Sequence, residues 1–114
     1  MLFRSMGSYG ELHRYNRLRN PGYPSHLFTL SRWSDEQALL ILVNFSPERS
    51  VQLTLELSAE VITGLGLQEG EYDLEDRLGQ GKATQLIVLE DEGHVAFQLT
   101  PLESIIYEVK TTRL

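Results

Sequence analysis

The chain of 114 residues contains no cysteine, a single tryptophan and no long uninterrupted apolar segment. The absence of cysteine excludes a disulfide framework and a thiolate metal site. No segment approaches the ~20 apolar residues that span a bilayer. Residues 1–7 carry one basic side chain and lack the apolar stretch of a signal peptide. These absences predict that the protein has no membrane partner, and they favour a cytoplasmic location over a secreted one.

Basic side chains are scarce beyond the first 26 residues, and the formal net charge is −6. Residues 1–26 hold four arginines and one glutamate, whereas residues 27–114 hold six basic and fifteen acidic side chains. An acidic body disfavours nucleic acid, because that affinity depends on neutralising phosphates. The three histidines are scattered without the spacing of a zinc site. We therefore expect no nucleic-acid partner, no metal and no cofactor.

From His26 onward, apolar residues recur with a period of two, which is typical of β-strands. The stretch 38–45 is apolar on both faces, as in a central strand covered on both sides. Short polar stretches rich in Ser, Asp, Pro and Gly separate the apolar runs and favour tight turns. The pattern predicts a short helical turn over 58–64, which Ser58 caps and Gly64 ends. The predicted strands are 26–33, 38–45, 50–57, 71–78, 83–89, 94–99 and 104–110.

Seven short strands at this spacing predict an all-β fold, an antiparallel β-sandwich of seven to eight strands with Greek-key connections. Residues 26–114 are assigned to this domain. Residues 1–25 are predicted to be an irregular leader or linker, because glycines and prolines interrupt them. The leader is expected to add an edge strand or to extend as an arm, and Glu11 to Leu18 can form two helical turns with only a weak apolar stripe.

Four short motifs occur along the predicted sandwich in a recognisable order. They are SRW at 31–33, LVNFS at 42–46, GEYDLEDRL at 70–78 and LTPLESIIYEV at 99–109. Together they resemble domain C, the C-terminal β-sandwich of the α-amylase superfamily of glycoside hydrolases. The similarity extends over most of the region from residue 26 to residue 110.

The resemblance implies a carbohydrate-processing enzyme in which a (β/α)8 barrel performs the chemistry and domain C packs beside it. Such a barrel needs ~250 residues, so this chain cannot contain one. No position matches the family's catalytic nucleophile or general acid, and none is assigned. The resemblance therefore implies that this chain is not itself an enzyme. It implies a noncatalytic accessory domain that stabilises the catalytic barrel as its partner and exposes an apolar patch when isolated, through which it self-associates.

Carboxylates are plentiful in this sequence but are not arranged as a catalytic pair. Glu71, Asp73 and Glu75 share one face of a predicted strand, which is typical of a solvated surface. The run from Glu90 to Gly93 favours an acidic hairpin turn over a calcium loop. Asn44 interrupts an apolar strand, so its amide needs partners, and we expect it to tie down the turn after Phe45.

Aromatic side chains are the best candidates for binding a ligand, because sugar rings stack on exposed tryptophan and tyrosine. Trp33, together with Tyr23, Tyr15 or Tyr9 from the leader, can form a small platform for a glucan. The alternative is that Trp33 packs into the core or against the missing barrel. Two further functions stay open beside the accessory domain. One is a carbohydrate-binding module that uses these aromatics, and the other is a freestanding protein-interaction domain.

Overall fold

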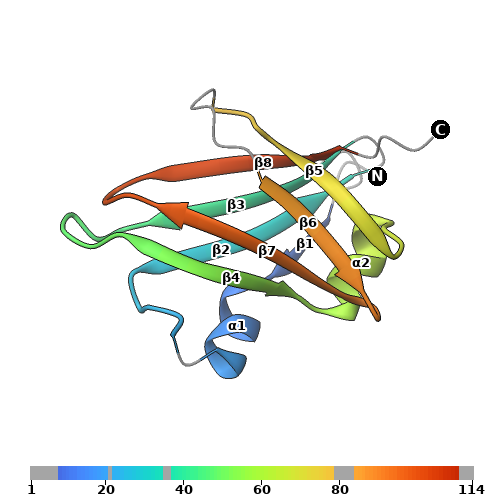
Figure 1. Cartoon of the computed structure of the whole chain (residues 1–114), viewed down its shortest axis with the longest axis horizontal. Helices are drawn as coiled ribbons and strands as arrows, with labels where there is room; N and C mark the ends of the chain where they lie inside the picture. The colour runs from blue at the N-terminus through green and yellow to red at the C-terminus, as the bar shows by residue number, and fades with distance from the viewer. Residues whose placement is uncertain (1–7, 21, 35–36, 79–83, 111–114) are drawn as a thin grey trace.

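A computed structural model describes residues 8–20, 22–34, 37–78 and 84–110, with the backbone only for 8–11. Strands dominate, and two helices of seven residues each accompany them (Figure 1). Neither described helix is long and apolar enough to cross a bilayer. The elements are β1 (Ser8–Glu11), α1 (His13–Arg19), β2 (Leu27–Trp33), β3 (Ala38–Asn44), β4 (Val51–Leu57), α2 (Ala59–Leu65), β5 (Gly70–Asp76), β6 (Thr84–Leu89), β7 (Glu92–Leu99) and β8 (Ser104–Lys110).

The strands form one antiparallel sheet in the order β1-β2-β3-β8-β5-β6-β7-β4. Successive strands β5, β6 and β7 lie side by side, and β8 returns beside β5, which is the strand order of a Greek key. The sheet curls until it nearly closes into a barrel, with β4 and β7 on the near side and β1 and β2 behind (Figure 1). The predicted antiparallel β architecture is confirmed. The two separate sheets of a sandwich do not form, because β5 pairs with both β6 and β8 and joins all the strands.

The predicted strand positions are confirmed to within two residues at each end. The predicted helical turn is also present as α2, and the Ser58 hydroxyl accepts a hydrogen bond from the Val61 N–H. The prediction that Gly64 ends this helix is wrong. Gly66 is the residue that leaves the helix, with a left-handed φ of 73°, so Gly64 lies within the last turn.

Aliphatic side chains at alternating positions fill the inside of the curled sheet. Leu40, Leu42, Leu55 and Ile105 are completely buried there, and Tyr107 is nearly so. Each fully buried aliphatic side chain contributes about 2 kcal/mol relative to its exposed state. Helix α2 adds further apolar residues to the same core. One continuous core therefore supports the whole sheet.

The leader is more ordered than the irregular segment that the sequence predicts. Strand β1 pairs with β2 as an edge strand, and α1 packs against both β2 and β4. Leu12 and Asn16 are fully buried, and Tyr23 is 8% exposed. Since β4 is the last strand at the other end of the sheet, α1 bridges the gap that the curled sheet leaves. The prediction that the leader is a linker from a catalytic barrel stays a prediction.

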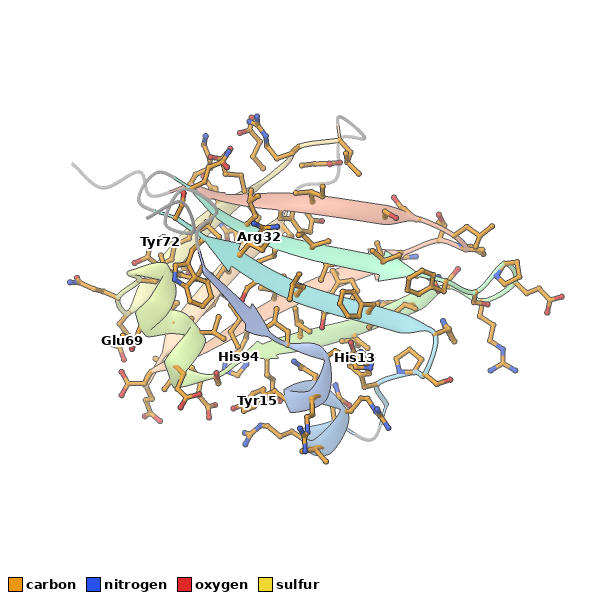
Figure 2. The ribbon with its side chains drawn as sticks, turned by 180° about the vertical axis from the view of Figure 1, so that it is seen from behind. His13, Tyr15, Arg32, Glu69, Tyr72 and His94 are labelled. Atoms are coloured by element: carbon orange, nitrogen blue, oxygen red, sulfur yellow. The ribbon has the colours of Figure 1, made fainter. Side chains whose placement is uncertain are left out.

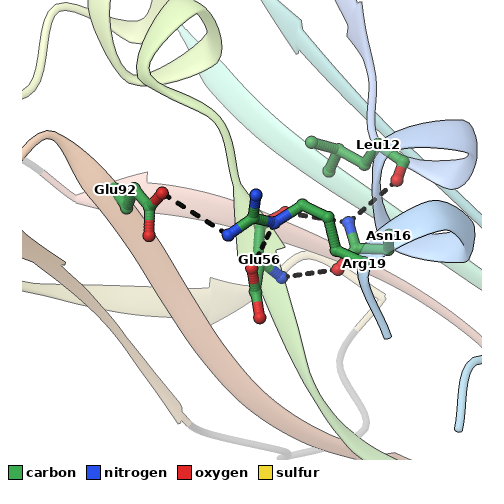
Figure 3. Close-up of polar contacts among 5 residues, drawn as sticks. All are labelled: Leu12, Asn16, Arg19, Glu56 and Glu92. Carbon is green, nitrogen blue, oxygen red and sulfur yellow. Dashed lines mark hydrogen bonds and ion pairs between the residues drawn. The ribbon is translucent and has the colours of Figure 1, made fainter. Parts of the chain in front are cut away.

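The side chain of Asn16 makes the contact that closes this gap (Figure 3). Its amide nitrogen donates to the Glu56 carbonyl at 2.8 Å, and its amide oxygen accepts from the Glu56 N–H at 2.7 Å. The pair of bonds imitates a strand partner for the exposed edge of β4. The same amide nitrogen donates to the Leu12 carbonyl at 2.8 Å, and Arg19 forms ion pairs with Glu56 and Glu92 at the surface.

Candidate functional site

The outer surface of β2, β3 and β8 is apolar at its centre. Along β3, Leu40 and Leu42 point into the core, while their neighbours Leu39, Ile41 and Val43 occupy the opposite face. The strand register places Phe28, Leu30 and Ile106 beside Val43 and Ile41, whereas Leu39 lies between Arg32 and Glu108. We call this surface, toward which Figure 2 looks, the outer apolar face. It consists of Phe28, Leu30, Leu39, Ile41, Val43, Phe45 and Ile106.

Solvent reaches every side chain of the outer apolar face. Phe45 is 63% exposed, Phe28 is 37% exposed and the other five are half-buried. The outer face of β5 differs, because it carries Glu71, Asp73 and Glu75, whereas β6 exposes Ile87 and Leu89. An antiparallel sheet usually turns a polar face to water. The apolar residues on β2, β3 and β8 depart from this pattern.

Charged side chains border the outer apolar face at one end. Arg77 forms an ion pair with Glu108 at 3.1 Å, and Lys110 forms one with Glu75 at 3.3 Å. Exposed pairs of this kind contribute less than about 1 kcal/mol to stability. An apolar centre with a polar rim is the usual composition of a protein–protein interface.

Asn44 anchors the opposite end of this face, as the sequence predicts. Its amide oxygen accepts from the Ser46 N–H at 3.0 Å, and its amide nitrogen donates to the carbonyls of Arg49 and Thr100. These bonds fix the turn after β3 to the turn after β7. The backbone of the turns that carry the exposed Phe45 and Leu102 is therefore held in place.

Tyr23, one of the aromatic candidates, is buried instead of being presented to solvent. Its hydroxyl lies 3.0 Å from the Thr29 hydroxyl and 2.9 Å from the His13 Nδ1 atom. A ring that is 8% exposed offers no face on which a sugar can stack. The inclusion of Tyr23 in an exposed platform therefore does not fit its position.

Trp33 and Tyr15 have separate neighbours. Trp33 is partly buried against the core and lies beside Gly64 of α2. The Arg19 guanidinium lies 5.0 Å from the centre of the Tyr15 ring. No ring contact in the described part of the chain joins any two of Trp33, Tyr23 and Tyr15. The backbone of Tyr9 belongs to β1, and its side chain is outside the described part.

The acidic residues occupy turns and solvated strand faces. Glu90 and Asp91 form the two-residue connection between β6 and β7, and both have positive φ angles, of 54° and 69°. The predicted hairpin turn is therefore confirmed. Within the described ranges, no group of three or more His, Asp or Glu side chains is placed to hold a metal ion.

Two buried phenols should make the protein lose stability in alkali. Burial raises the pKa of Tyr107, helped by the Asp76 and Glu103 carboxylates, and burial also raises the pKa of Tyr23. The unfolded chain therefore releases these protons first, near pH ~10, so the free energy of unfolding should fall as pH rises above that value. Urea unfolding between about pH 8 and about pH 11 measures this fall. Tyr107→Phe should make the fall shallower, and an unchanged slope would contradict the assignment.

No protein-family model and no curated protein matches this chain. The resemblance to domain C of the α-amylase superfamily therefore stays a prediction from the four sequence motifs.

Proposed function

We propose that this chain is a noncatalytic accessory domain of an α-amylase-like glycoside hydrolase, and that the outer apolar face is the surface that packs against the catalytic (β/α)8 barrel. The observation that carries the proposal is this face itself. Seven apolar side chains on one side of three adjacent strands are left in contact with water, where an antiparallel sheet usually carries polar residues.

The position of the face also fits the sequence motifs on which the resemblance depends. Val43 and Phe45 belong to the motif at 42–46, and Ile106 belongs to the motif at 99–109. Neighbouring residues of the same motifs, Leu42, Ile105 and Tyr107, point inward and belong to the core. In this proposal, the two motifs therefore serve both the fold and the docking surface. A (β/α)8 barrel is surrounded by a ring of helices, and in this proposal the outer apolar face packs against them.

The isolated chain should self-associate through this face, because no partner covers it. Ile41→Lys places a charge at the centre of the face, and we expect it to raise the dissociation constant for self-association at least about tenfold. Sedimentation velocity over a range of concentrations gives that constant. Ile87→Lys is the matched control, because Ile87 is 43% exposed on β6, outside the face. A chain that stays monomeric, or one that responds equally to both variants, would argue against the docking surface.

The partner itself can be identified directly. The reading frame upstream of the Met1 codon is sequenced, and any (β/α)8 barrel that it encodes is produced separately and mixed with this chain. Hydrogen exchange should then slow at the backbone amides of Phe28, Ile41 and Ile106, and Ile41→Lys should abolish that protection. If no barrel is encoded there, or if mixing protects none of these amides, the proposal fails.

A further inference from the structure

Two exposed apolar side chains lie at one end of the molecule. Phe45, in the turn after β3, is 63% exposed, and Leu102, in the turn after β7, is 64% exposed. The Leu102 N–H donates to the Ser46 carbonyl at 2.9 Å, so the two turns lie side by side, at the left end of Figure 1. We call residues 45–49 and 100–103 the tip. The tip adjoins the outer apolar face, to which Phe45 belongs.

Leu102 has a backbone conformation that leucine rarely adopts. Its φ is 60°, in the left-handed region, and the Glu103 N–H donates to the Thr100 carbonyl at 3.1 Å. With Pro101 before it, Leu102 therefore occupies the third position of a type II β-turn, which favours glycine or asparagine. A leucine is strained in this conformation, because its Cβ atom crowds the following carbonyl oxygen.

The fold gains little from the leucine side chain that carries this strain. Nearly two thirds of its surface is in solvent, and it does not belong to the hydrophobic core. Glycine at this position would keep the turn and relieve the strain. Strained residues cluster at sites that bind a ligand or partner. The strain at Leu102 therefore points to a function for its exposed side chain.

Hydrogen bonds fix the backbone of the tip before any partner binds. The Thr100 N–H donates to the Glu103 carboxylate at 2.8 Å, and the Arg49 N–H donates to the Ser46 hydroxyl at 2.9 Å. These bonds add to those by which Asn44 joins the two turns. A fixed backbone lowers the entropy that is lost when a partner orders the attached side chains. The tip is therefore preorganised for binding.

The charges of the tip are complementary to themselves. Glu48 and Arg49 are consecutive and exposed, and within the described ranges neither side chain forms an ion pair. A two-fold axis presents the same patch of both copies to each other. When such an axis passes through the tip, Glu48 of one protomer can face Arg49 of its partner, and the reverse. The occupant that this charge pattern fits is a second copy of the chain.

We propose that the tip anchors a symmetric dimer of this chain. Phe45 and Leu102 of the two copies pack together at the two-fold axis, Glu48 and Arg49 pair across it, and the outer apolar face supplies the rest of the buried surface. The inference deepens the proposed function, because it rests on the self-association expected of that face. It adds the residues that carry most of the affinity, since a few central side chains dominate a typical interface.

Variants of Leu102 test the anchor by sedimentation velocity. Leu102→Ala and Leu102→Gly both remove the apolar side chain, and each should raise the dissociation constant for self-association at least about tenfold. Leu102→Met keeps a large apolar side chain and should stay within about twofold of the parent chain. Leu89→Ala is the matched control, because Leu89 is 57% exposed on β6, outside the tip. It should leave the dissociation constant unchanged.

The strain at Leu102 is tested separately by thermal unfolding. Leu102→Gly should melt about 2–6 °C above Leu102→Ala, because glycine adopts the left-handed conformation without the crowding that any Cβ atom brings. Both variants lack the apolar side chain, so the difference between them reports the backbone alone. If Leu102→Gly does not melt above Leu102→Ala, the turn holds no strain and the argument for Leu102 fails.

Exchange of the two charges tests the two-fold arrangement. Glu48→Arg and Arg49→Glu each place like charges opposite each other across the axis, and each should raise the dissociation constant at least about threefold, with a larger effect at low salt. The double variant that carries both substitutions restores the opposite charges, so it should return to within about twofold of the parent chain. A double variant that stays as weak as either single variant would overturn the symmetric dimer.

The remaining outcomes distinguish the tip from the outer apolar face. If Ile41→Lys weakens self-association but Leu102→Ala acts like Leu89→Ala, the face stands and the inference about the tip is overturned. If the parent chain is monomeric, both proposals fail. If Leu102→Ala weakens only the binding to a barrel encoded upstream and leaves self-association unchanged, the anchor serves the barrel and the dimer is overturned.

Discussion

Asn16→Leu should lower the free energy of unfolding by about 3 kcal/mol, a large share of the stability of a small domain. The substitution keeps a buried side chain of similar size but removes three hydrogen bonds, one to the Leu12 carbonyl and two to the Glu56 backbone. The N–H and C=O groups of Glu56 then lose their partner at the edge of β4. Urea unfolding gives the free energy, and hydrogen exchange at the Glu56 amide should become faster.

Two further variants distinguish the contribution of the Asn16 amide from that of the groups around it. Asn16→Asp preserves the shape but replaces two donated bonds with a carboxylate facing two carbonyls, so it should be at least as harmful at neutral pH. Arg19→Met removes the exposed ion pairs to Glu56 and Glu92 and the guanidinium contact with the Tyr15 ring, so it should change the unfolding midpoint little. If Arg19→Met and Asn16→Leu destabilise equally, the amide does not close the barrel.

The role of Asn16 could not be predicted from local sequence patterns, because it depends on a contact between distant parts of the chain. The strands were predictable because each depends on alternation within about seven residues, and the turn at Asn44 was predictable because a polar residue in an apolar strand needs nearby partners. The partner of Asn16 is Glu56, which is 40 residues away in the sequence. The helix that carries Asn16 has only a weak apolar stripe. The glycines and prolines of the leader therefore predicted an irregular segment, and the role of α1 in closing the sheet could not be predicted.

The same reasoning applies to the outer apolar face. The apolar pattern on both faces of residues 38–45 predicts that both faces are covered, and the structure places a core on one face and the outer apolar face on the other.

Gly64→Ala should destabilise the protein by about 2 kcal/mol, although alanine is the better helix former by about 1 kcal/mol. Gly64 lies within α2, and a Cβ atom there would lie 2.7 Å from Cε2 of Trp33 and nearer still to Cζ2. The partly buried indole would have to move away from the core. Urea unfolding measures the loss, and the emission of Trp33, the single tryptophan, should shift as its ring is displaced.

The effect of Gly64→Ala on the free energy of unfolding should change sign in a protein that lacks the Trp33 indole. With Trp33→Leu already present, the clash disappears, so Gly64→Ala should become stabilising by about 0.5–1 kcal/mol through helix propensity alone. Gly66 is the matched control, because its φ of 73° opposes any Cβ whatever the neighbouring side chain. Gly66→Ala should therefore destabilise by about 1 kcal/mol in both backgrounds. If Gly64→Ala stays destabilising without the indole, close packing of Trp33 on α2 is not the reason that glycine stands at this position.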